Sequence, residues 1–487
     1  MIGTQMTQMR SNIYSMNHYY IGIDIGTTAT KAMVFTREGQ VVDYQCISYE
    51  MHHPHPDWSV QKPSVVLKAV VDCIENLTQK ITPQFISFSA AMQSLIAVDS
   101  NGEPLTDVIL WADNRASEIA QNLRESELGK QFYQKTGIPI HTFSPMTKIL
   151  WLKENEPEVL ARTDKFISLK EYIWHHLTGE YVIDSSMASG TGMMNIECLC
   201  WNDKILNYLG ISQNNLSKIV SPKYTSISLL NNHRLVLGGG DGALANLGTG
   251  AMQKGRMSLT IGTSGAVRLP IEKPFIDNKM RTQCYHLIDN QYLTLGAVNN
   301  GAIILQWLKE SILQTNETFD ELISQAQNVP AGSNGLIFVP YLLGERAPIW
   351  DASAQGTILG ITINHTKSHF IRATLEGILF GLLSITEILL PVKKDREQIT
   401  IMASGGFAKN DVWLQIAADI FQMKVAVSQK VEGSAWGAVL IGFIAFNIDS
   451  NCTQIEEKIF LPNKENKLVY QENFMKFSKV YEALKGL

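Results

Sequence analysis

The sequence lacks several features that mark common classes of protein. Its net charge of −5 over 487 residues leaves no basic excess, which disfavours nucleic acid or an anionic membrane as a partner. No apolar run approaches the roughly 20 residues that span a bilayer. Residues 1–20 contain no apolar stretch typical of a secretory signal. We therefore expect a cytoplasmic protein, with residues 1–17 forming a disordered or loosely ordered N-terminal tail.

Cysteine is scarce, at six residues. Only Cys198 and Cys200 are close in sequence, and no cysteine and histidine spacing suits a structural zinc ion. Because thiols stay reduced in the cytosol, the sequence predicts six free cysteines.

Familiar enzyme motifs are also missing. No Gly-Lys-Ser/Thr ending suits a Walker A loop. No Gly-x-Gly-x-x-Gly fingerprint follows the first expected strand, Tyr20–Asp24, which disfavours a Rossmann dehydrogenase. No nucleophile elbow suggests a Ser-His-Asp hydrolase.

What is present is a repeated hairpin. The chain is too long for a single hydrophobic core, which stops growing near roughly 250–300 residues, so two domains are expected. Residues 21–35 (IGIDIGTTATKAMVF) and 258–269 (SLTIGTSGAVRL) each read as a strand, a Gly-Thr turn and a returning strand. This repeat predicts two domains built on one plan. We place them at residues 18–250 and 251–487.

The first turn, Gly26-Thr27-Thr28, has the chemistry of a phosphate site. Glycine lets the backbone approach a phosphate, and N–H and hydroxyl groups then donate to its oxygens. Asp24, at the strand end, suits a Mg²⁺ ion, and Lys31 offers a cation to a transferred phosphoryl group. Such turns also occur for purely structural reasons, but the matching turn at Gly262 and Thr263 favours phosphate contact.

Asp241 lies in a glycine-rich turn, residues 238–243 (GGGDGA), after the expected strand Leu235–Leu237. Glycines on both sides leave room for a substrate hydroxyl, as a general base requires. The local sequence alone favours another role, in which Asp241 caps a helix beginning at Ala243.

Two further segments are ambiguous by themselves. Gly405 and Gly406 follow the expected strand Gln398–Ala403, where backbone can lie against an adenine or an α-phosphate, but such turns are common. Residues 111–115 (WADNR) suit a polyol, since Trp111 can cover C–H surface and Arg115 can bind hydroxyls or a carboxylate. The alternative is a helix N-terminus with Asp113 as its cap and Arg115 in solvent.

Two longer segments carry a family resemblance. Residues 143–155 (FSPMTKILWLKEN), and residues 356–361 (GTILGI) with His369-Phe370 and 373–376 (ATLE), resemble the two signatures of the FGGY carbohydrate kinases. The resemblance extends from about Tyr20 to about Phe443. It implies an α/β fold of two ribonuclease-H-like (actin-like ATPase) domains, with ATP and Mg²⁺ in the cleft between them.

The resemblance also assigns residues. It implies that Asp241 is the catalytic base and that Asp24 and Asp241 lie at the metal. The implied nucleotide contacts are Gly26, Thr27, Thr28, Lys31, Gly262, Thr263, Gly301, Gly405, Gly406 and Asn410.

Within the family, residues 87–99, 109–115, 136–151, 187–195 and 341–348 resemble gluconate kinases. The expected substrate is therefore a sugar acid, D-gluconate, phosphorylated on its terminal hydroxyl. The expected substrate contacts are Met92, Gln93, Trp111, Arg115 and Asp241, with Arg115 binding the carboxylate.

Alternatives stay open. Gln93 stands where related kinases often carry histidine, so xylulose or another pentulose is the alternative substrate. An actin-like ATPase without a small-molecule acceptor would explain the two phosphate turns but not the polyol-suited segment 87–115. By resemblance alone, a homodimer is plausible.

Overall fold

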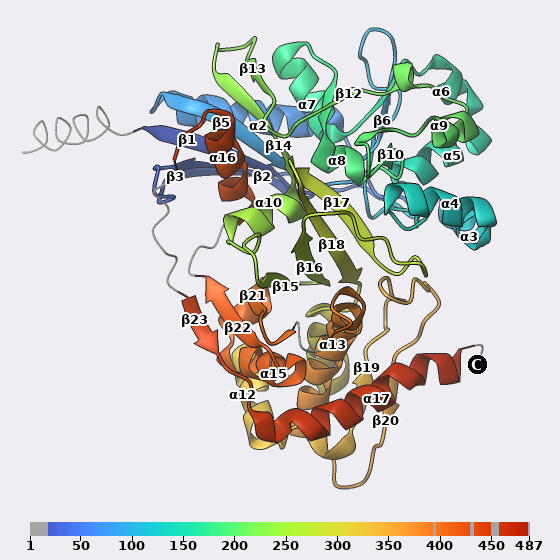
Figure 1. The fold of residues 1–487 in the computed structure, drawn as a ribbon, viewed down its shortest axis with the longest axis vertical. Coiled ribbons are helices and arrows are strands. Elements are labelled where there is room, and N and C mark those ends of the chain that lie inside the picture. The colour runs from blue at the N-terminus through green and yellow to red at the C-terminus, as the bar shows by residue number, and fades with distance from the viewer. Residues whose placement is uncertain (1–17, 393–395, 429–432, 450–456, 486–487) are drawn as a thin grey trace, which may run out of the picture.

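The structure, a computed structural model, describes residues 18–392, 396–428, 433–449 and 457–485. The expected tail, residues 1–17, lies outside these ranges. Two mixed β-sheets dominate the described chain, one in each half of the sequence (Figure 1).

The first sheet begins with the expected three-stranded meander. Its strands follow the order β13-β14-β5-β1-β2-β3; β1 and β2, then β2 and β3, pair antiparallel, whereas β5 and β14 continue the sheet in parallel. The bounds are β1 Tyr19–Ile25, β2 Ala29–Phe35, β3 Val41–Ser48, β5 Pro83–Ala90, β13 Thr225–Ile227 and β14 Arg234–Gly240. Helix α2 (Pro63–Thr78), which begins at the predicted proline, packs on β2 and β3.

The second sheet repeats this plan. Its order is β17-β18-β16-β15-β21-β22-β23, so β15, β16 and β18 correspond to β1, β2 and β3, and the parallel strands β21 and β22 correspond to β5 and β14. The bounds are β15 Arg256–Ile261, β16 Gly265–Ile271, β17 Gln283–Ile288, β18 Gln291–Val298, β21 Thr400–Ser404, β22 Lys424–Ser428 and β23 Glu457–Phe460. The common strand order confirms the predicted α/β fold with two sheets on one plan.

Helix α16 (Gly433–Ala445) crosses from the second half of the chain to the first sheet. It follows β22 in sequence but packs on β1, β5 and helix α10 (Asp241–Gly248). The approach is close enough to require glycine: a Cβ on Gly22 would lie 2.1 Å from the Ala435 carbonyl oxygen. The domain limits 18–250 and 251–487 stay a prediction. Helix α16 belongs to the second range by sequence but packs on the first sheet.

The remaining elements surround the sheets. Between β5 and β14 lie α3 Ser117–Glu125, α4 Glu127–Thr136, α5 Pro145–Asn155, α6 Pro157–Arg162, α7 Leu169–Thr178, α8 Ser185–Ser189 and α9 Asp203–Leu209. The second half adds α11 Ile303–Trp307, α12 Phe319–Gln325, α13 Lys367–Leu389, α15 Asp411–Phe421 and α17 Lys467–Leu484. Short strands include β4 Val60–Gln61, β6 Ile96–Val98, β7 Val108–Ile109, β8 Lys165–Ile167, β9 Val182–Asp184, β10 Met194–Asn195, β11 Cys200–Trp201, β12 Lys218–Val220, β19 Ile337–Val339 and β20 Thr357–Leu359.

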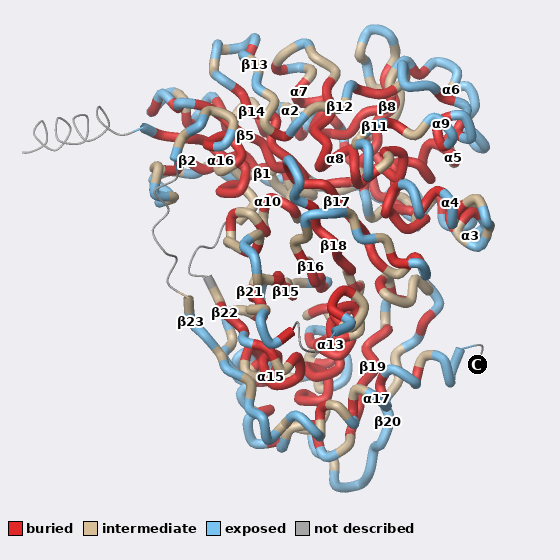
Figure 2. The backbone as a smooth tube through the Cα atoms, viewed as in Figure 1, coloured by how far each residue is buried: buried red, intermediate tan, exposed pale blue. Residues whose placement is uncertain are grey.

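Two large apolar cores lie on these sheets. The first contains β1, β5 and β14 together with side chains of α16, and the second is centred on β15, β21 and helix α13. Figure 2 shows buried backbone running through the strands of both sheets and along α13.

The prediction of six free cysteines was wrong for one pair. Cys198 and Cys200 form a disulfide in the turn between β10 and β11. Leu199 adopts a left-handed backbone there (φ 52°), and the two Cα atoms lie 5.4 Å apart, within the ordinary disulfide range. Cys46, Cys73 and Cys284 are free, and Cys452 lies outside the described residues.

Candidate active site

The first Gly-Thr turn joins β1 and β2 at the edge of the first sheet. The Gly26 N–H donates to the Ala29 carbonyl at 3.0 Å, and Tyr49 anchors the turn by donating to the Gly26 carbonyl at 2.7 Å. The Trp111 indole donates to Thr27 Oγ1 at 3.2 Å. The predicted phosphate turn and the predicted sugar residue Trp111 are therefore neighbours.

Asp24 and Asp241 lie at the same edge of this sheet. Asp24 is directly opposite Lys31 of β2, and it accepts a hydrogen bond from Ser89 of β5 at 2.9 Å. Ser89 pairs with Gly239 of β14, just before Asp241. Because the carboxyl ends of parallel strands meet at one edge, the two carboxylates lie there together.

Asp241 does not cap its helix. Helix α10 begins at Asp241 itself, its N-cap is Gly240, and no side chain caps it. Asp241 Oδ1 instead accepts from its neighbour's N–H, that of Gly242, at 2.7 Å. The capping alternative was wrong, and a half-buried carboxylate stands at a helix N-terminus, which favours negative charge.

The second turn is held by the chain that follows β18. The Ala302 N–H donates to the Gly262 carbonyl at 2.7 Å, and Gly301 N–H donates to Thr263 O at 3.2 Å. Gly301 has no room for a side chain, because a Cβ would lie 2.5 Å from the Ser264 carbonyl carbon. A Cβ on Gly262 would meet nothing within 4 Å. The second turn thus offers open backbone at Gly262.

The glycine pair after β21 lies against the second turn's strand. Gly405 is left-handed (φ 89°), and a Cβ there would lie 2.4 Å from the Ile261 carbonyl oxygen. Gly406 begins a short 3₁₀ turn. Asn410 caps α15 by accepting from the Val412 N–H at 3.1 Å. The roles of all three as nucleotide contacts stay predictions.

Four side chains from both halves of the chain lie near one tyrosine, Tyr285. We call Gln93, Asp241, Arg268, Tyr285 and Arg346 the interdomain cluster. Gln93 Nε2 donates to the Tyr285 hydroxyl at 2.9 Å, and that hydroxyl donates to Gln283. The charges of Arg268, Arg346 and Asp241 all act on the pKa of Tyr285, so these groups lie near it.

Burial dominates the electrostatics of the cluster. It raises the pKa of Asp241 above the usual aspartate range, while the Gly242 N–H and the Arg268 guanidinium oppose this rise. Burial likewise lowers the pKa values of Arg268 and Arg346. Next to Arg346, burial raises the pKa of Glu345 to about 7, although hydrogen bonds from Asn300 and Asn299 favour its charged form.

Sequence reasoning missed three members of the cluster. Arg268 stands in an apolar strand just after the second turn, and that lone charge was an available signal. Arg346 lies in the segment 341–348 that carries the family resemblance. Tyr285, in the buried strand β17, gives no local signal.

Two predicted substrate residues are engaged elsewhere. The Arg115 guanidinium is bound by Asp113 through Nε at 2.8 Å and Nη2 at 2.9 Å, and it stacks 3.7 Å from the Trp58 ring centroid. The alternative with Arg115 in solvent was wrong, since its side chain is 5% exposed. Met92 is buried, and a Cβ on Gly240 would lie 2.6 Å from its sulfur. Their roles at the substrate stay predictions.

A metal ion fits the site only with help from a ligand. In the part of the chain that the structure describes, no group of three His, Cys, Asp or Glu side chains is placed to hold a metal. Asp24 and Asp241 supply two hard carboxylates, and Mg²⁺ is commonly bound by one or two carboxylates plus substrate phosphates. The donor set therefore fits a magnesium ion that arrives with a nucleotide.

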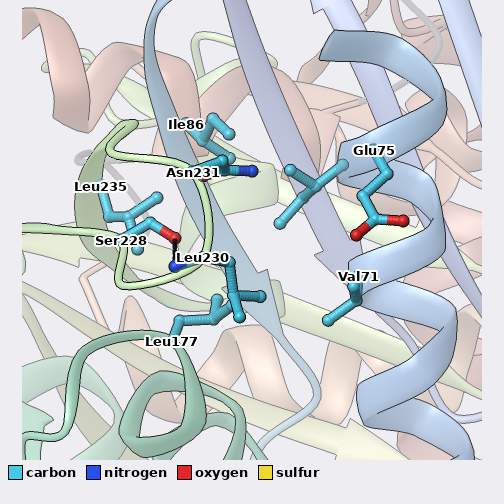
Figure 3. Close-up of a pocket in the computed structure, with 9 residues that line it drawn as sticks. Val71, Glu75, Ile86, Leu177, Ser228, Leu230, Asn231 and Leu235 are labelled. Carbon is cyan, nitrogen blue, oxygen red and sulfur yellow. Dashed lines mark hydrogen bonds between the residues drawn. The ribbon is translucent and has the colours of Figure 1, made fainter. Parts of the chain in front are cut away.

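A small closed pocket lies away from these residues. It is lined by α2, β5 and the loop before β14, and Figure 3 shows mainly apolar side chains around it, including Val71, Ile86 and Leu235. Its volume of about 10 Å³ suffices for no more than one water molecule. It is a packing defect and no substrate site.

Comparison with known proteins decides the family. Residues 19–248 match the N-terminal domain, and residues 257–446 the C-terminal domain, of the FGGY family of carbohydrate kinases. This chain belongs to that family. It is a phosphotransferase with an alcohol group as acceptor, and carbohydrate kinases of this family use ATP.

Individual relatives are similar over most of their length. A gluconokinase of Bacillus licheniformis is 40% identical over 456 residues, covering 88% of each chain. A gluconate kinase and a ligand-bound xylulose kinase, both of Lactobacillus acidophilus, are each 35% identical with TM-scores of 0.92, covering 96% of this chain and 99% of theirs. Among the described residues, no helix is long and apolar enough to cross a membrane.

Proposed function

We propose that this chain transfers the γ-phosphoryl group of ATP to the terminal hydroxyl, O6, of D-gluconate. The observation that carries the proposal is the pair of half-buried, desolvated arginines, Arg268 and Arg346, that lie near Tyr285 and Asp241. Desolvated guanidinium groups are costly unless an anion meets them. Arg268 already faces the carboxylate of Asp241, but the Nε of Arg346 has no hydrogen-bond partner among the described residues. A sugar acid supplies a carboxylate for it, whereas a neutral pentulose supplies no anion.

Asp241 is the base in this proposal. It accepts the proton of O6, and its raised pKa brings it nearer to neutral pH, as suits a general base. Arg268, the cation that faces Asp241, neutralises charge that develops on the transferred group. Domain closure would exclude water from this transfer.

Arg346 is suited to the carboxylate at the other end of the sugar. Its charge lowers the pKa of Tyr285 but is not among the charges that shift the pKa of Asp241. Its Nη2 donates to the Val298 carbonyl at 3.1 Å, while its buried Nε has no hydrogen-bond partner among the described residues. An oxygen of a bound carboxylate would satisfy that donor. Because Arg115 is already paired with Asp113, Arg346 replaces it in this role.

The nucleotide side follows from the two turns. The backbone at Gly26, Thr27 and Thr28 and at Gly262 and Thr263 would donate to phosphate oxygens. A bound Mg²⁺ ion would add neutralising charge beside the two carboxylates. Lys31, opposite Asp24, brings a further cation to the same edge.

Similarity supports this substrate. The 40% identical relative is a gluconokinase, and 88% of each chain is covered. The second candidate is xylulose, favoured by the equally similar xylulose kinase structure and by Gln93 in place of histidine.

The test is ADP release by purified protein with Mg-ATP, using gluconate, D-xylulose, D-ribulose, glycerol or no acceptor. Turnover on gluconate alone supports the proposal. Asp241→Asn should abolish that turnover, and Asp72→Asn, a surface carboxylate on α2 paired with Lys68, should not. Turnover on xylulose alone would refute the gluconate assignment, and equal ADP release without an acceptor would refute sugar phosphorylation itself.

A further inference from the structure

Lys148, in the first signature segment, is fully buried. It lies in the first half of α5 and has 0% of its surface exposed. Its ammonium donates to the Gln93 carbonyl at 2.5 Å and to the Ile109 carbonyl at 3.4 Å. No carboxylate among the described residues lies within ion-pair distance of it, and the nearby Asp113 is bound to Arg115.

A buried ammonium that has only carbonyl partners is costly. Burial lowers the pKa of Lys148 to about 7, with Asp113 opposing the shift and Arg115 adding to it. A methionine would fill similar space without this desolvation cost. What an ammonium offers that a methionine lacks is its N–H donors. Both hydrogen bonds that Lys148 donates go to backbone carbonyls.

The carbonyl that Lys148 holds belongs to a residue in an unusual conformation. Gln93 is left-handed, with φ 70°, a backbone conformation that is strained for a residue other than glycine. This conformation turns the Gln93 carbonyl toward Lys148 and leaves its side-chain amide in contact with the Tyr285 hydroxyl at 2.9 Å. Gln93 thus connects a buried cation to the interdomain cluster.

The second carbonyl ties this turn to its neighbour. Ile109 O, in β7, also accepts the Leu95 N–H at 2.9 Å. The strand β7 directly precedes residues 111–115. The Lys148 ammonium therefore joins the two segments, 91–95 and 108–111, that carry the predicted sugar contacts Gln93 and Trp111.

We propose that Lys148 is a positioning residue of the sugar site. Its ammonium fixes the left-handed backbone of Gln93 and so aims the Gln93 amide at Tyr285, where the substrate is proposed to bind. Lys148 itself has no exposed surface with which to touch a sugar. The inference rests on the proposed sugar site, but it holds for either candidate sugar.

The test is a double-mutant cycle with Lys148→Met and Gln93→Ala, assayed on whichever sugar the wild type phosphorylates. Loss of a charged hydrogen bond predicts that Lys148→Met raises the sugar KM about tenfold or more. The KM for ATP should stay within about twofold, because both nucleotide turns lie outside this contact. Since Lys148 acts through Gln93, the double variant should be no worse than Gln93→Ala.

Lys153→Met is the matched control. Lys153 lies on the same helix, is exposed, and donates to the Tyr208 carbonyl at 2.8 Å, so its loss should leave both KM values unchanged. The proposal would be overturned if the effects of Lys148→Met and Gln93→Ala on the sugar KM multiply in the double variant. It would also be overturned if Lys148→Met raises the KM for the sugar and the KM for ATP equally. Turnover of xylulose but not gluconate would overturn the substrate assignment and leave this cycle fully measurable.

A second background, Gln93→Gly, distinguishes the loss of positioning in Lys148→Met from a folding defect. Glycine adopts the left-handed conformation without strain, so Gln93→Gly removes the need for the ammonium. In that background, adding Lys148→Met should change the sugar KM by less than about twofold. A further large rise in the sugar KM there would refute positioning through Gln93.

Discussion

Asp241 and Arg268 face each other from the two halves of the chain. Asp241 follows β14 of the first sheet as the first residue of α10, and Arg268 lies in β16 of the second. The Arg268 Nε lies 3.3 Å from where a Cβ on Gly242 would stand, so the guanidinium covers the first turn of α10. The proposed base thus has its counter-charge on the opposite domain, and the pair forms only when both domains are folded.

This pairing predicts a shift in pH dependence. Asp241 must be ionised to accept a proton, and Arg268 lowers its pKa. Arg268→Met removes that effect, so the Asp241 pKa rises and the acid limb of kcat/KM moves to higher pH. Profiles of kcat/KM against pH for both proteins check this. The exposed Arg162→Met serves as control, and an acid limb that stays in place would contradict the pairing.

Substitutions of Arg346 and of Arg115 should have different effects. Arg346→Met should raise the KM for gluconate about tenfold or more, since a charged hydrogen bond is lost, and leave the KM for ATP and the melting temperature nearly unchanged.

Arg115→Met should mainly destabilise the protein. It leaves the fully buried Asp113 without its cation, which costs about 3–5 kcal/mol for a broken buried pair. Urea unfolding and gluconate kinetics on both variants separate the two arginines. A large gluconate KM effect in a stable Arg115→Met protein would restore Arg115 as the carboxylate partner.

The second turn offers a pair of glycine variants. Gly262→Ala should leave the melting temperature unchanged, because its Cβ meets nothing within 4 Å. It should raise the KM for ATP if phosphate approaches that backbone. Gly301→Ala should lower the melting temperature, since its Cβ would overlap the Ser264 backbone. An unchanged KM for ATP in Gly262→Ala would remove this turn from the nucleotide site.

The raised pKa of Glu345 predicts that the free energy of unfolding changes with pH. Its folded pKa of about 7 exceeds its ordinary 4.5, so the folded state binds more protons between these values. Stability should therefore fall as pH rises from 4.5 to 7, by up to about 1.4 kcal/mol per pH unit from this group.

Glu345→Gln should flatten that slope, whereas the exposed Glu125→Gln should keep it. Urea unfolding at several pH values measures both. An identical slope in wild type and Glu345→Gln would show that Glu345 ionises without cost.

Much of the fold could be predicted because its signals are local. An apolar run, a Gly-Thr turn and a returning run dictate a hairpin at residues 21–35 and again at 258–269, since turn geometry and strand pairing depend on neighbouring residues. The repeat therefore predicted two similar sheets. The glycines around Asp241 likewise marked a carboxylate with space beside it.

Tertiary structure alone decided which charges meet. Arg268, Tyr285 and Arg346 are far from Asp241 in sequence, and no local pattern encodes an approach between two domains. The same holds for α16, which packs on the first sheet, and for Arg115, whose partner Asp113 and stacking ring Trp58 enclose it. The sequence by itself determined the strands, turns and family; long-range packing, which buries side chains from distant segments together, determined the site.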